Sequence, residues 1–483
     1  MITPRPLEVR IPMAVITSAL SPATAVPASP AEDREAARRV PVQSARLPRY
    51  TSYPTALQFS GAVGPDQAAA WMRAVAGHDP VSIYIHVPFC DTLCWFCGCH
   101  TRVINTRGPI VAFVHSLIAE IEMVGALLGR RHPVRHLHFG GGSPTILEPE
   151  DIDRIFQTLA RSFDIGADAE IALEIDPRDV DPARLDAWAT AGVNRASLGV
   201  QDLDPVVQKA INRIQPAEAT ARAVTMLRER GINAINIDLV HGLPHQTTDG
   251  VLATLDQVLT LTPDRVALFG YAHVPSMKQH QRLIPDAALP GPAARLEQAD
   301  AAARRLKAAG YVGIGLDHFA RAHDPLAVAQ RQGLLRRNFQ GYTTDNAAAI
   351  IGFGPSAIGD LPGGYVQNTI DVRAWREAVA EGRLATIRGV AVDDDDRLRR
   401  AVIERLMCDH AVDVAAVAAS MGRDPEVLAG AMALIDPLED RGIVLRDGWR
   451  LLVPVEMTPD IQRVAACFDA YLNPAVRQLI AAE

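Results

Sequence analysis

Four of the six cysteines lie within ten residues of each other, at Cys90, Cys94, Cys97 and Cys99. They directly follow Ser82–Val87, a β-branched, alternating run that predicts a strand ending at Pro88. Thiolates this close together repel one another unless a metal or an iron–sulfur cluster takes up their charge. The spacing therefore indicates a metal or cluster site at the end of a strand.

Three kinds of site could use these cysteines. Disulfide frameworks are typical of small secreted proteins, whereas this chain is long and acidic and has only two other cysteines. A structural zinc site usually needs two ligand pairs, and Cys408 and Cys467 are distant and not spaced as a pair. An iron–sulfur cluster held by closely spaced thiolates fits best, with zinc as the alternative.

Composition and charge narrow the class of protein. The 483 residues are 48% hydrophobic and 22% charged, as expected for a soluble globular protein with one large and one smaller domain. A net charge of −8 argues against nucleic-acid binding, and a polyanionic ligand would need a local basic pocket. Residues 11–30 are uncharged but are interrupted by prolines, which argues against a membrane span. We therefore predict a disordered extension over residues 1–45, with a targeting signal as the alternative.

Short apolar runs alternate with amphipathic stretches after residue 70 and predict a parallel sheet with helical crossovers. The first such helix begins at Gly108-Pro109 and repeats its apolar residues every three or four positions as far as Leu128. Six βα units predict an α/β fold with an incomplete barrel, and a closed eight-unit barrel is the alternative. The strand candidates are Ser82–Val87, Val134–Phe139, Glu170–Ile175, Arg195–Val200, Ala234–Val240 and Arg265–Gly270.

A polar or glycine-rich segment ends or follows each of these strands. The carboxyl ends of barrel strands meet at one rim, where α/β barrels build their active sites. We therefore expect the segments to converge on one site. In chain order they are the cysteines, Gly140–Thr145, Glu174 with Asp176, Gln201, Asp238 and Tyr271–His273.

Specific strings of residues resemble a known family. The spacing Cys90-x3-Cys94-x2-Cys97 resembles that of radical S-adenosylmethionine enzymes, in which three cysteines hold a 4Fe–4S cluster and one iron stays open for S-adenosylmethionine. The lead-in Tyr84-Ile-His86-Val-Pro-Phe-Cys90 and the added Gly98-Cys99 resemble the oxygen-independent coproporphyrinogen III oxidases of that superfamily. The resemblance extends from about Leu47 to about Leu472 and implies the superfamily's incomplete (βα)6 barrel.

The resemblance implies two molecules of S-adenosylmethionine and assigns residues to each. Catalytic roles fall to Tyr84 and His86, and the metal ligands are the first three cysteines, without Cys99 as an essential ligand. The residues that match contacts to the first, cluster-bound molecule are Tyr84, Gly141, Glu174 and Ile358. Those that match contacts to the second are Phe96, Gly142, Ser143, Gln201, Arg213, Asp238 and Ala272.

Two further strings point to the substrate. Residues 49–56 resemble an N-terminal arm that lies over the active site in these oxidases and that related heme-binding proteins lack. Residues 337–344 read as a solvated basic loop on composition alone, but they resemble a signature of the same oxidases. Arginine forks suit ligands that bear carboxylates, so Arg49 and Arg337 are the candidate substrate contacts.

The last ninety residues predict a small, mainly helical domain. The helical patterns are Arg397–Asp409, Val412–Met421 and Pro425–Leu438. A hairpin signal at Asp447-Gly448 follows them, and this order predicts a winged-helix-like domain that covers the open side of the barrel. We expect Cys408 and Cys467 to be buried in apolar surroundings. The predicted segments are 1–45 (extension), 46–64 (arm), 65–392 (barrel) and 393–483 (C-terminal domain).

The resemblance implies an enzyme that converts two propionates of coproporphyrinogen III to vinyl groups and yields protoporphyrinogen IX, through a 5′-deoxyadenosyl radical. It further implies an electron donor for the cluster, an unidentified terminal electron acceptor, and a cytoplasmic monomer without nucleic-acid or membrane partners. Two alternatives stay open: a radical S-adenosylmethionine paralogue acting as a heme chaperone or tetrapyrrole-modifying enzyme, and a non-catalytic iron–sulfur or zinc-binding module.

Overall fold

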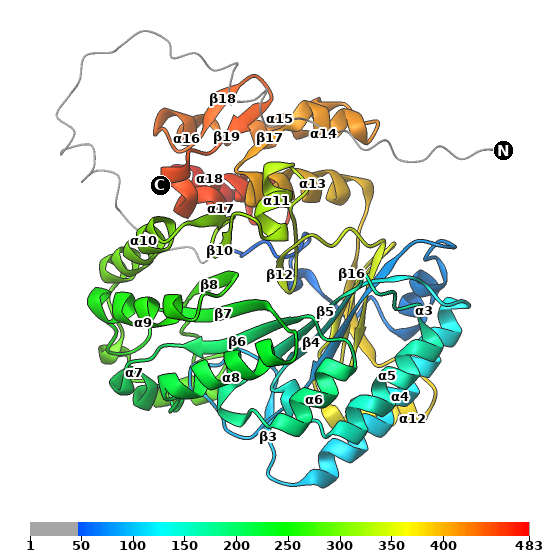
Figure 1. The fold of residues 1–483 in the computed structure, drawn as a ribbon. Helices are drawn as coiled ribbons and strands as arrows, with labels where there is room; N and C mark the ends of the chain where they lie inside the picture. Colours follow the sequence, from blue (N-terminus) through cyan, green and yellow to red (C-terminus); the bar gives the residue numbers. More distant parts are fainter. Residues whose placement is uncertain (1–46, 483) are drawn as a thin grey trace.

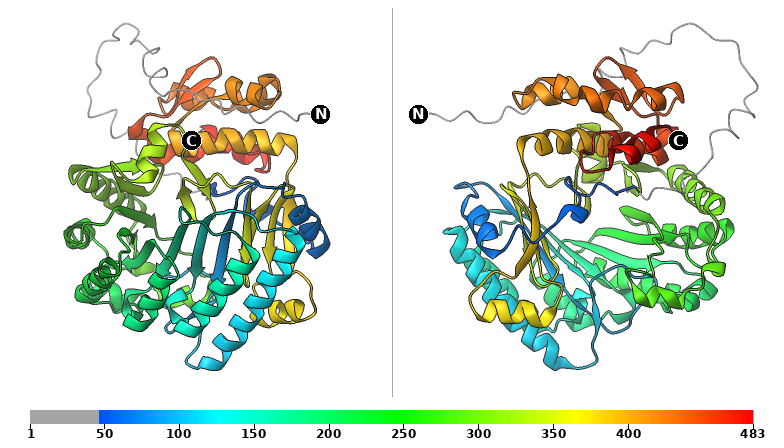
Figure 2. Two further views of the ribbon diagram at one scale, coloured as in Figure 1. Left: turned by 45° about the vertical axis from the view of Figure 1, so that its right-hand side comes forward. Right: turned by 180° about the vertical axis from the view of Figure 1, so that it is seen from behind.

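The computed structural model describes residues 47–482, so the extension expected at residues 1–45 lies outside the described part of the chain. A curved twelve-stranded sheet forms the centre of the molecule, with helices packed on its outer face (Figure 1). The C-terminal segment forms a separate layer across one end of the curved sheet, which is clearest from behind (Figure 2).

All six predicted strands are present, and they pair in parallel in chain order. They are β1 (Val81–Val87), β4 (Val134–Gly141), β5 (Glu170–Ile175), β6 (Arg195–Gln201), β7 (Ala234–His241) and β8 (Arg265–Gly270). A seventh parallel strand that the sequence did not predict, β13 (Ala349–Phe353), pairs with the other side of β1.

Antiparallel strands extend the sheet at both edges. They are β14 (Ile358–Leu361), β15 (Gly364–Asn368) and β16 (Thr386–Ala391) beyond β13, and β10 (His318–Arg321) and β9 (Tyr311–Ile314) beyond β8. Within residues 47–482 no backbone pairing joins β16 to β9. The prediction of an incomplete barrel is therefore confirmed, and one side of the curved sheet stays open.

The crossover helices place their apolar faces against the sheet. They are α4 (Arg107–Leu128), α5 (Pro149–Ser162), α6 (Pro182–Thr190), α7 (Pro205–Ala210), α8 (Ala217–Glu229), α9 (Thr248–Thr260) and α10 (Pro292–Ala308). Three further helices accompany them: α3 (Pro65–Arg73), α11 (Pro325–Arg331) and α12 (Val372–Ala380). By length and composition alone α4 could cross a membrane, yet its Phe113, Leu117 and Ile121 are buried in the main core, as in a core helix of a barrel.

A buried carboxylate in α4 ties three elements together. Glu120 accepts hydrogen bonds from the Gly354 amide (2.7 Å), Asn368 Nδ2 (2.9 Å) and Trp375 Nε1 (3.0 Å). Burial raises the pKa of Glu120 to about 7, although these three donors act in the opposite direction. The carboxylate thereby fixes the turn between β13 and β14 and the first turns of α12 against α4.

The C-terminal domain combines short helices with a small sheet, as predicted. Its helices are α13 (Asp394–Asp409), α14 (Val414–Ser420), α15 (Ala429–Met432), α16 (Asp436–Asp440), α17 (Ile461–Cys467) and α18 (Pro474–Ala482). The predicted hairpin is β18 (Leu445–Asp447) with β19 (Arg450–Leu452), and β17 (Ala411–Asp413) pairs with β19 as a third strand. The helix expected over Pro425–Leu438 is instead divided into a 3₁₀ turn, α15 and α16. Cys408 and Cys467 are buried, as expected.

The N-terminal arm crosses the open side of the barrel. Tyr50 and Tyr53 are buried in the core of the C-terminal domain, where Tyr50 donates to Asp469 Oδ2 (3.1 Å) and Tyr53 accepts from the Ala470 amide (2.9 Å). Arg49 Nη2 donates to the Gly270 carbonyl at the end of β8 (3.0 Å), and Ser60 pairs with Gly389 of β16. Residues 49–60 therefore connect a strand near one edge of the sheet to the strand at the other edge, beneath the C-terminal domain.

Replacing Glu120 by Ala should destabilise the fold, because each of three buried donors left unpaired costs about 1–3 kcal/mol. We expect a fall in Tm of about 5 °C or more. The pKa of Glu120 is higher in the folded protein than in the unfolded chain, so proton binding to Glu120 favours the folded state. This contribution to the free energy of unfolding is complete below pH 4.5 and is lost as the pH rises through about 7. The Tm difference from wild type should therefore be larger at pH 5 than at pH 8.

The matched control is Glu122→Ala on the same helix, because Glu122 is exposed and pairs only with the exposed Arg161. Its Tm should match wild type. Equal Tm values for the two variants would refute the role of Glu120 as a tie between elements.

Candidate active site

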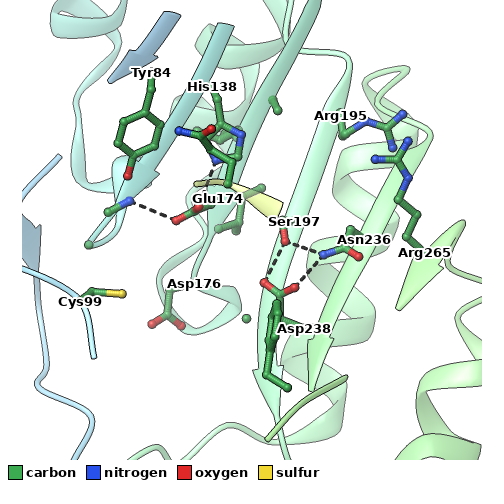
Figure 3. A pocket seen from close by; sticks show the side chains of 18 of the residues that line it. Tyr84, Cys99, His138, Glu174, Asp176, Arg195, Ser197, Asn236, Asp238 and Arg265 are labelled. Carbon is green, nitrogen blue, oxygen red and sulfur yellow. Dashed lines mark hydrogen bonds and ion pairs between the residues drawn. The ribbon is translucent and has the colours of Figure 1, made fainter. Parts of the chain in front are cut away.

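A cavity of about 410 Å³ lies inside the curved sheet and reaches the carboxyl ends of the strands. Its polar wall residues occupy alternate positions along neighbouring strands, so they all belong to the inward face (Figure 3). From β1 and β4 to β8 these residues are Ser82, Tyr84, His136, His138, Glu170, Glu174, Arg195, Ser197, Gln201, Asn236, Asp238 and Arg265.

The cysteine loop forms one end of this cavity, and all four of its cysteines line it. Cys90 ends the short strand β2 (Phe89–Cys90), which pairs with β3 (Arg102–Val103) and so fixes both ends of the loop. The thiols are near donors: Thr101 Oγ1 lies 3.0 Å from Cys90 Sγ, and the Cys99 amide lies 3.3 Å from Cys97 Sγ. The pKa of Cys97 is lowered, chiefly by its hydrogen bond with the Cys99 thiol.

These residues fit an iron–sulfur cluster. Within residues 47–482 no three His, Cys, Asp or Glu side chains converge as closely as a single metal ion requires. A cluster of four irons spreads its sulfur ligands more widely than one ion does, and the donors beside Cys90 and Cys97 suit anionic sulfur. Cys90, Cys94 and Cys97 all line the cavity wall, with Cys99 beside Cys97.

An arginine pair joins the cysteine loop to the ends of the strands. Asp176 accepts from Arg178 Nη2 (2.6 Å) and Arg213 Nη1 (3.0 Å), and Arg213 Nη1 also lies 3.3 Å from Cys94 Sγ. Burial opposes ionisation of Asp176, but the two guanidinium groups outweigh it and lower its pKa. Arg213 was predicted from the sequence, whereas Arg178 was missed because it stands in a polar turn after Pro177.

Glu174 stands where β4 and β5 meet the cavity. It accepts from the Gly141 amide (3.1 Å) and from His138 Nε2 (3.0 Å). Burial opposes ionisation, but the hydrogen bond and the charge of His138 outweigh it and lower the pKa of Glu174. Its side chain is 40% exposed, and that surface faces the cavity, so the carboxylate can accept further hydrogen bonds from a ligand.

The glycine triplet before Ser143 packs against protein atoms. A Cβ added at Gly140 would lie 2.7 Å from Glu174 Oε1, one at Gly141 would lie 2.6 Å from the His86 ring, and one at Gly142 would lie 2.2 Å from the Phe89 carbonyl oxygen. Glycine is therefore required at Gly141 and Gly142, where the neighbours are the His86 ring and a backbone carbonyl, whereas a side chain at Gly140 would displace the Glu174 carboxylate.

Asp238 is a carboxylate held by neutral donors. It accepts from Ser197 Oγ (2.9 Å) and Asn236 Nδ2 (2.7 Å), and burial raises its pKa in spite of them. Within the described residues no arginine, lysine or histidine forms an ion pair with it. A ligand that brings a hydroxyl or a positive charge would complete its environment.

A charged layer at the amino ends of the strands forms the deep end of the cavity, and sequence reasoning missed it. Arg195 pairs with Glu170 (2.9 Å) and Arg265 with Asp324 (2.9 Å), and the two guanidinium groups lie side by side in Figure 3. Arg195 stands two and six residues before Ser197 and Gln201 of the same strand, and that alternation was a signal that could have identified it. Arg265 is followed on its face of β8 by Ala267 and Phe269, so no such pattern marked it.

Four predicted site residues, the catalytic candidate His86 and three cofactor-site candidates, do not line the cavity. His86 is buried behind Tyr84, with Nδ1 hydrogen-bonded to the Tyr84 hydroxyl (3.0 Å) and Nε2 to the His100 carbonyl (2.8 Å). Ser143 is hydrogen-bonded to Thr145 (3.0 Å), and Ile358 packs against Phe59 and Tyr365. Ala272 is exposed, and its carbonyl accepts from Gln281. The remaining predicted residues, Tyr84, Phe96, Gly141, Gly142, Glu174, Gln201, Arg213 and Asp238, are brought together at the cavity.

The two arginines predicted to contact substrate also lie outside the cavity lining. Arg337 is only 8% exposed; its guanidinium carbon lies 4.2 Å from the centre of the Tyr342 ring, and Nη2 donates to the Arg49 carbonyl (3.3 Å). Its Nε and Nη1 are buried without a hydrogen-bond partner in the described residues. The hairpin of β11 (Arg336–Asn338) and β12 (Gly341–Thr343) nevertheless reaches the cavity through Asn338, Gln340 and Tyr342.

Comparison with known proteins agrees with this arrangement. Residues 84–258 match the Radical SAM superfamily, and residues 392–454 match the HemN C-terminal domain. The first match therefore covers β1 to α9, including the cysteine loop and the glycine triplet.

Similar proteins cover nearly the whole chain. An oxygen-independent coproporphyrinogen III oxidase from Bradyrhizobium diazoefficiens is 49% identical over 89% of this chain and 95% of its own length. One from Salmonella typhimurium is 40% identical over 89% of this chain and 94% of its own. The structure of the Escherichia coli coproporphyrinogen III oxidase, described as a radical SAM enzyme, superimposes with a TM-score of 0.83 and 40% identity over 88% of this chain and 98% of that one. The chain therefore belongs to the oxygen-independent coproporphyrinogen III oxidases of the radical S-adenosylmethionine superfamily.

Proposed function

We propose that this protein decarboxylates two propionate side chains of coproporphyrinogen III to vinyl groups without oxygen, giving protoporphyrinogen IX. The proposal rests on one observation: three closely spaced cysteines line a cavity with polar walls. The chain that carries them is 49% identical to an oxidase of this kind. When bound, the 4Fe–4S cluster and S-adenosylmethionine supply a 5′-deoxyadenosyl radical, which removes a hydrogen atom from the substrate.

The test is anaerobic incubation of cluster-loaded protein with S-adenosylmethionine, a reductant and coproporphyrinogen III, followed by product analysis. Formation of protoporphyrinogen IX with two 5′-deoxyadenosines per product supports the proposal. Tight heme binding without conversion of the substrate would instead favour the heme-chaperone paralogue.

The proposed cofactor roles follow from the contacts of each side chain. Cys90, Cys94 and Cys97 would hold the cluster, and the cation of Arg213 beside Cys94 would offset negative charge on it. Glu174 would accept hydrogen bonds from ribose hydroxyls of the first S-adenosylmethionine, since its carboxylate is ionised and faces the cavity. The hydrogen bond that the Tyr84 hydroxyl donates to His86 Nδ1 would orient Tyr84 at the same site.

The second S-adenosylmethionine would lie on the side of Asp238 and Gln201. Asp238 offers a buried carboxylate without a cation of its own, and a sulfonium or ammonium group would supply one. Phe96, Gly142 and Arg213 line the same cavity from the cysteine side, so we assign them to this molecule as well. Ser143 and Ala272 would act through their backbone positions, and Ile358 through packing beside Phe59.

The arm, the β11–β12 hairpin and the C-terminal domain would close the cavity over the tetrapyrrole and exclude water. We divide the chain accordingly into an extension (1–45), the arm (46–64), the barrel (65–392) and the C-terminal domain (393–483). Arg49 and Arg337 would meet propionates where the arm approaches the hairpin. We also propose that the enzyme is a cytoplasmic monomer, served by a separate electron donor and a terminal electron acceptor.

The cluster assignment predicts about four irons per chain in anaerobically purified protein. Cys94→Ser should lose the cluster, because a ligand is removed, whereas Cys99→Ser should retain it. The cluster content is measured by iron and sulfide analysis and by electron paramagnetic resonance of the reduced protein. Stoichiometric zinc, or loss of iron in Cys99→Ser alone, would overturn the assignment.

Asp238→Asn should remove the second S-adenosylmethionine and leave iron content unchanged, because the neutral amide cannot balance a cationic ligand. Equilibrium binding to cluster-loaded protein should fall from two molecules per chain to one, and porphyrinogen turnover should fall with it. Asp249→Asn, an exposed position at the start of the next helix, is the control and should still bind two. Saturation of the wild type at one molecule would refute the two-site proposal.

Arg337→Ala should weaken the binding of coproporphyrinogen roughly ten- to hundredfold, as expected for loss of one charge-assisted carboxylate contact of about 1.5–3 kcal/mol. The neighbouring Arg336→Ala is the matched control, because that side chain is 51% exposed and pairs with Glu404. The KM for coproporphyrinogen III of each variant measures the effect. An unchanged KM in Arg337→Ala would exclude Arg337 from the substrate site.

A further inference from the structure

One histidine of the cavity wall belongs to neither the cysteine loop nor the parallel strands. His318 begins β10, next to β8, and lines the cavity on the side where the β11–β12 hairpin and the arm close the barrel. The cluster ligands assigned above come from the loop after β1. The cavity residues assigned to the two S-adenosylmethionine molecules come from β1, from β4 to β7, and from the loops after these strands. The wall formed by β10 and the hairpin is therefore left for another ligand.

Three contacts fix the orientation of the His318 ring. Its Nδ1 lies 2.8 Å from Asp317 Oδ1. Its faces and edge meet Phe269 and Tyr342 in edge-to-face contacts, with ring centres 5.5 and 5.2 Å apart. A ring held on three sides in this way presents its remaining nitrogen, Nε2, in one direction only.

The environment leaves Nε2 available to a ligand. Within the described residues no hydrogen bond engages it. At Gly341 of the hairpin a Cβ would lie 3.4 Å from Nε2, and the glycine leaves that space without a side chain. By contrast, the arginines of the cavity wall, such as Arg178, Arg195 and Arg265, each direct guanidinium nitrogens to an acid of the protein itself.

Asp317 supplies a counter-charge behind the His318 ring. Asp317 is ionised, because its hydrogen bond with His318 and the charges of His318, Arg337 and Arg49 outweigh burial and lower its pKa. An aspartate that accepts from Nδ1–H stabilises the imidazolium form of the ring, and in that form Nε2 also carries a proton, which faces the cavity.

We propose that His318 binds a propionate carboxylate of the substrate through Nε2–H, and that Asp317 is the positioning residue that holds its ring. This inference rests on the proposed function, since the carboxylate is that of the tetrapyrrole. It adds a substrate contact on β10, two strands along the sheet from Asp238 on β7, in a position where Arg337 and Arg49 lie behind the same aspartate.

Two substitutions of one residue test the contact. A Gln side chain can place its amide nitrogen near the position of Nε2, whereas Asn reaches only as far as Nδ1. His318→Asn should therefore weaken the binding of coproporphyrin III, followed by its fluorescence, and raise the KM for coproporphyrinogen III, each ten- to hundredfold. His318→Gln should lose less than about tenfold, because it keeps a neutral donor of roughly half the strength.

Asp317→Asn separates positioning from direct contact. It keeps an acceptor for Nδ1 but removes the charge, so KM should rise by about threefold to tenfold while kcat changes less. His323→Asn, an exposed histidine just beyond the same strand, is the matched control and should behave as wild type in binding and KM. Iron content of every variant reports whether the barrel has folded and loaded its cluster.

The outcomes distinguish this inference from the function on which it rests. If wild type converts coproporphyrinogen III and His318→Asn binds it equally well, the inference is wrong and the function stands. If Asn and Gln variants lose binding equally and also lose iron, His318 is structural and the inference is again wrong. If the wild type does not convert coproporphyrinogen III at all, the proposed function fails and the inference fails with it.

Discussion

The alternation of side chains along the parallel strands is the constraint on which the whole site depends. Helices cover the outer face of the sheet, so every second residue must be apolar, and the residues between them face the cavity. A register shift of one residue would turn Glu174 and Asp238 into the helical layer and expose leucines and isoleucines to the cavity. The polar interior is stable because its charges are paired: Asp176 with two arginines, Glu170 with Arg195 and Asp324 with Arg265.

Much of this architecture could be predicted because it is local in sequence. The six parallel strands and α4 were recognised from hydrophobic period, and Asp447-Gly448 correctly marked the hairpin of the C-terminal domain. The convergence of polar strand ends followed from parallel pairing alone, and Tyr84, Glu174, Gln201 and Asp238 do meet at one cavity.

The features that were missed depend on contacts between distant segments. β13 is a five-residue apolar run that becomes a parallel strand only by pairing with β1, more than two hundred and fifty residues earlier. The helix expected at Pro425–Leu438 is interrupted, and Asp436-Pro437 begins a separate turn because proline cannot donate within a continuing helix. Arg337 was predicted to contact substrate, but its neighbour Asn338 lines the cavity while Arg337 itself lies on the ring of Tyr342, outside the lining.

The ties between the arm and the last helices impose an order on assembly. Tyr50 and Tyr53 find their partners only at Asp469 and Ala470, near the end of the chain. During synthesis the cysteine loop leaves the ribosome long before those residues exist, so the flank of the barrel stays unsealed while the sheet is already forming. The flank of the barrel is therefore closed last, after the strands that carry the cysteines and the cavity residues have all been synthesised.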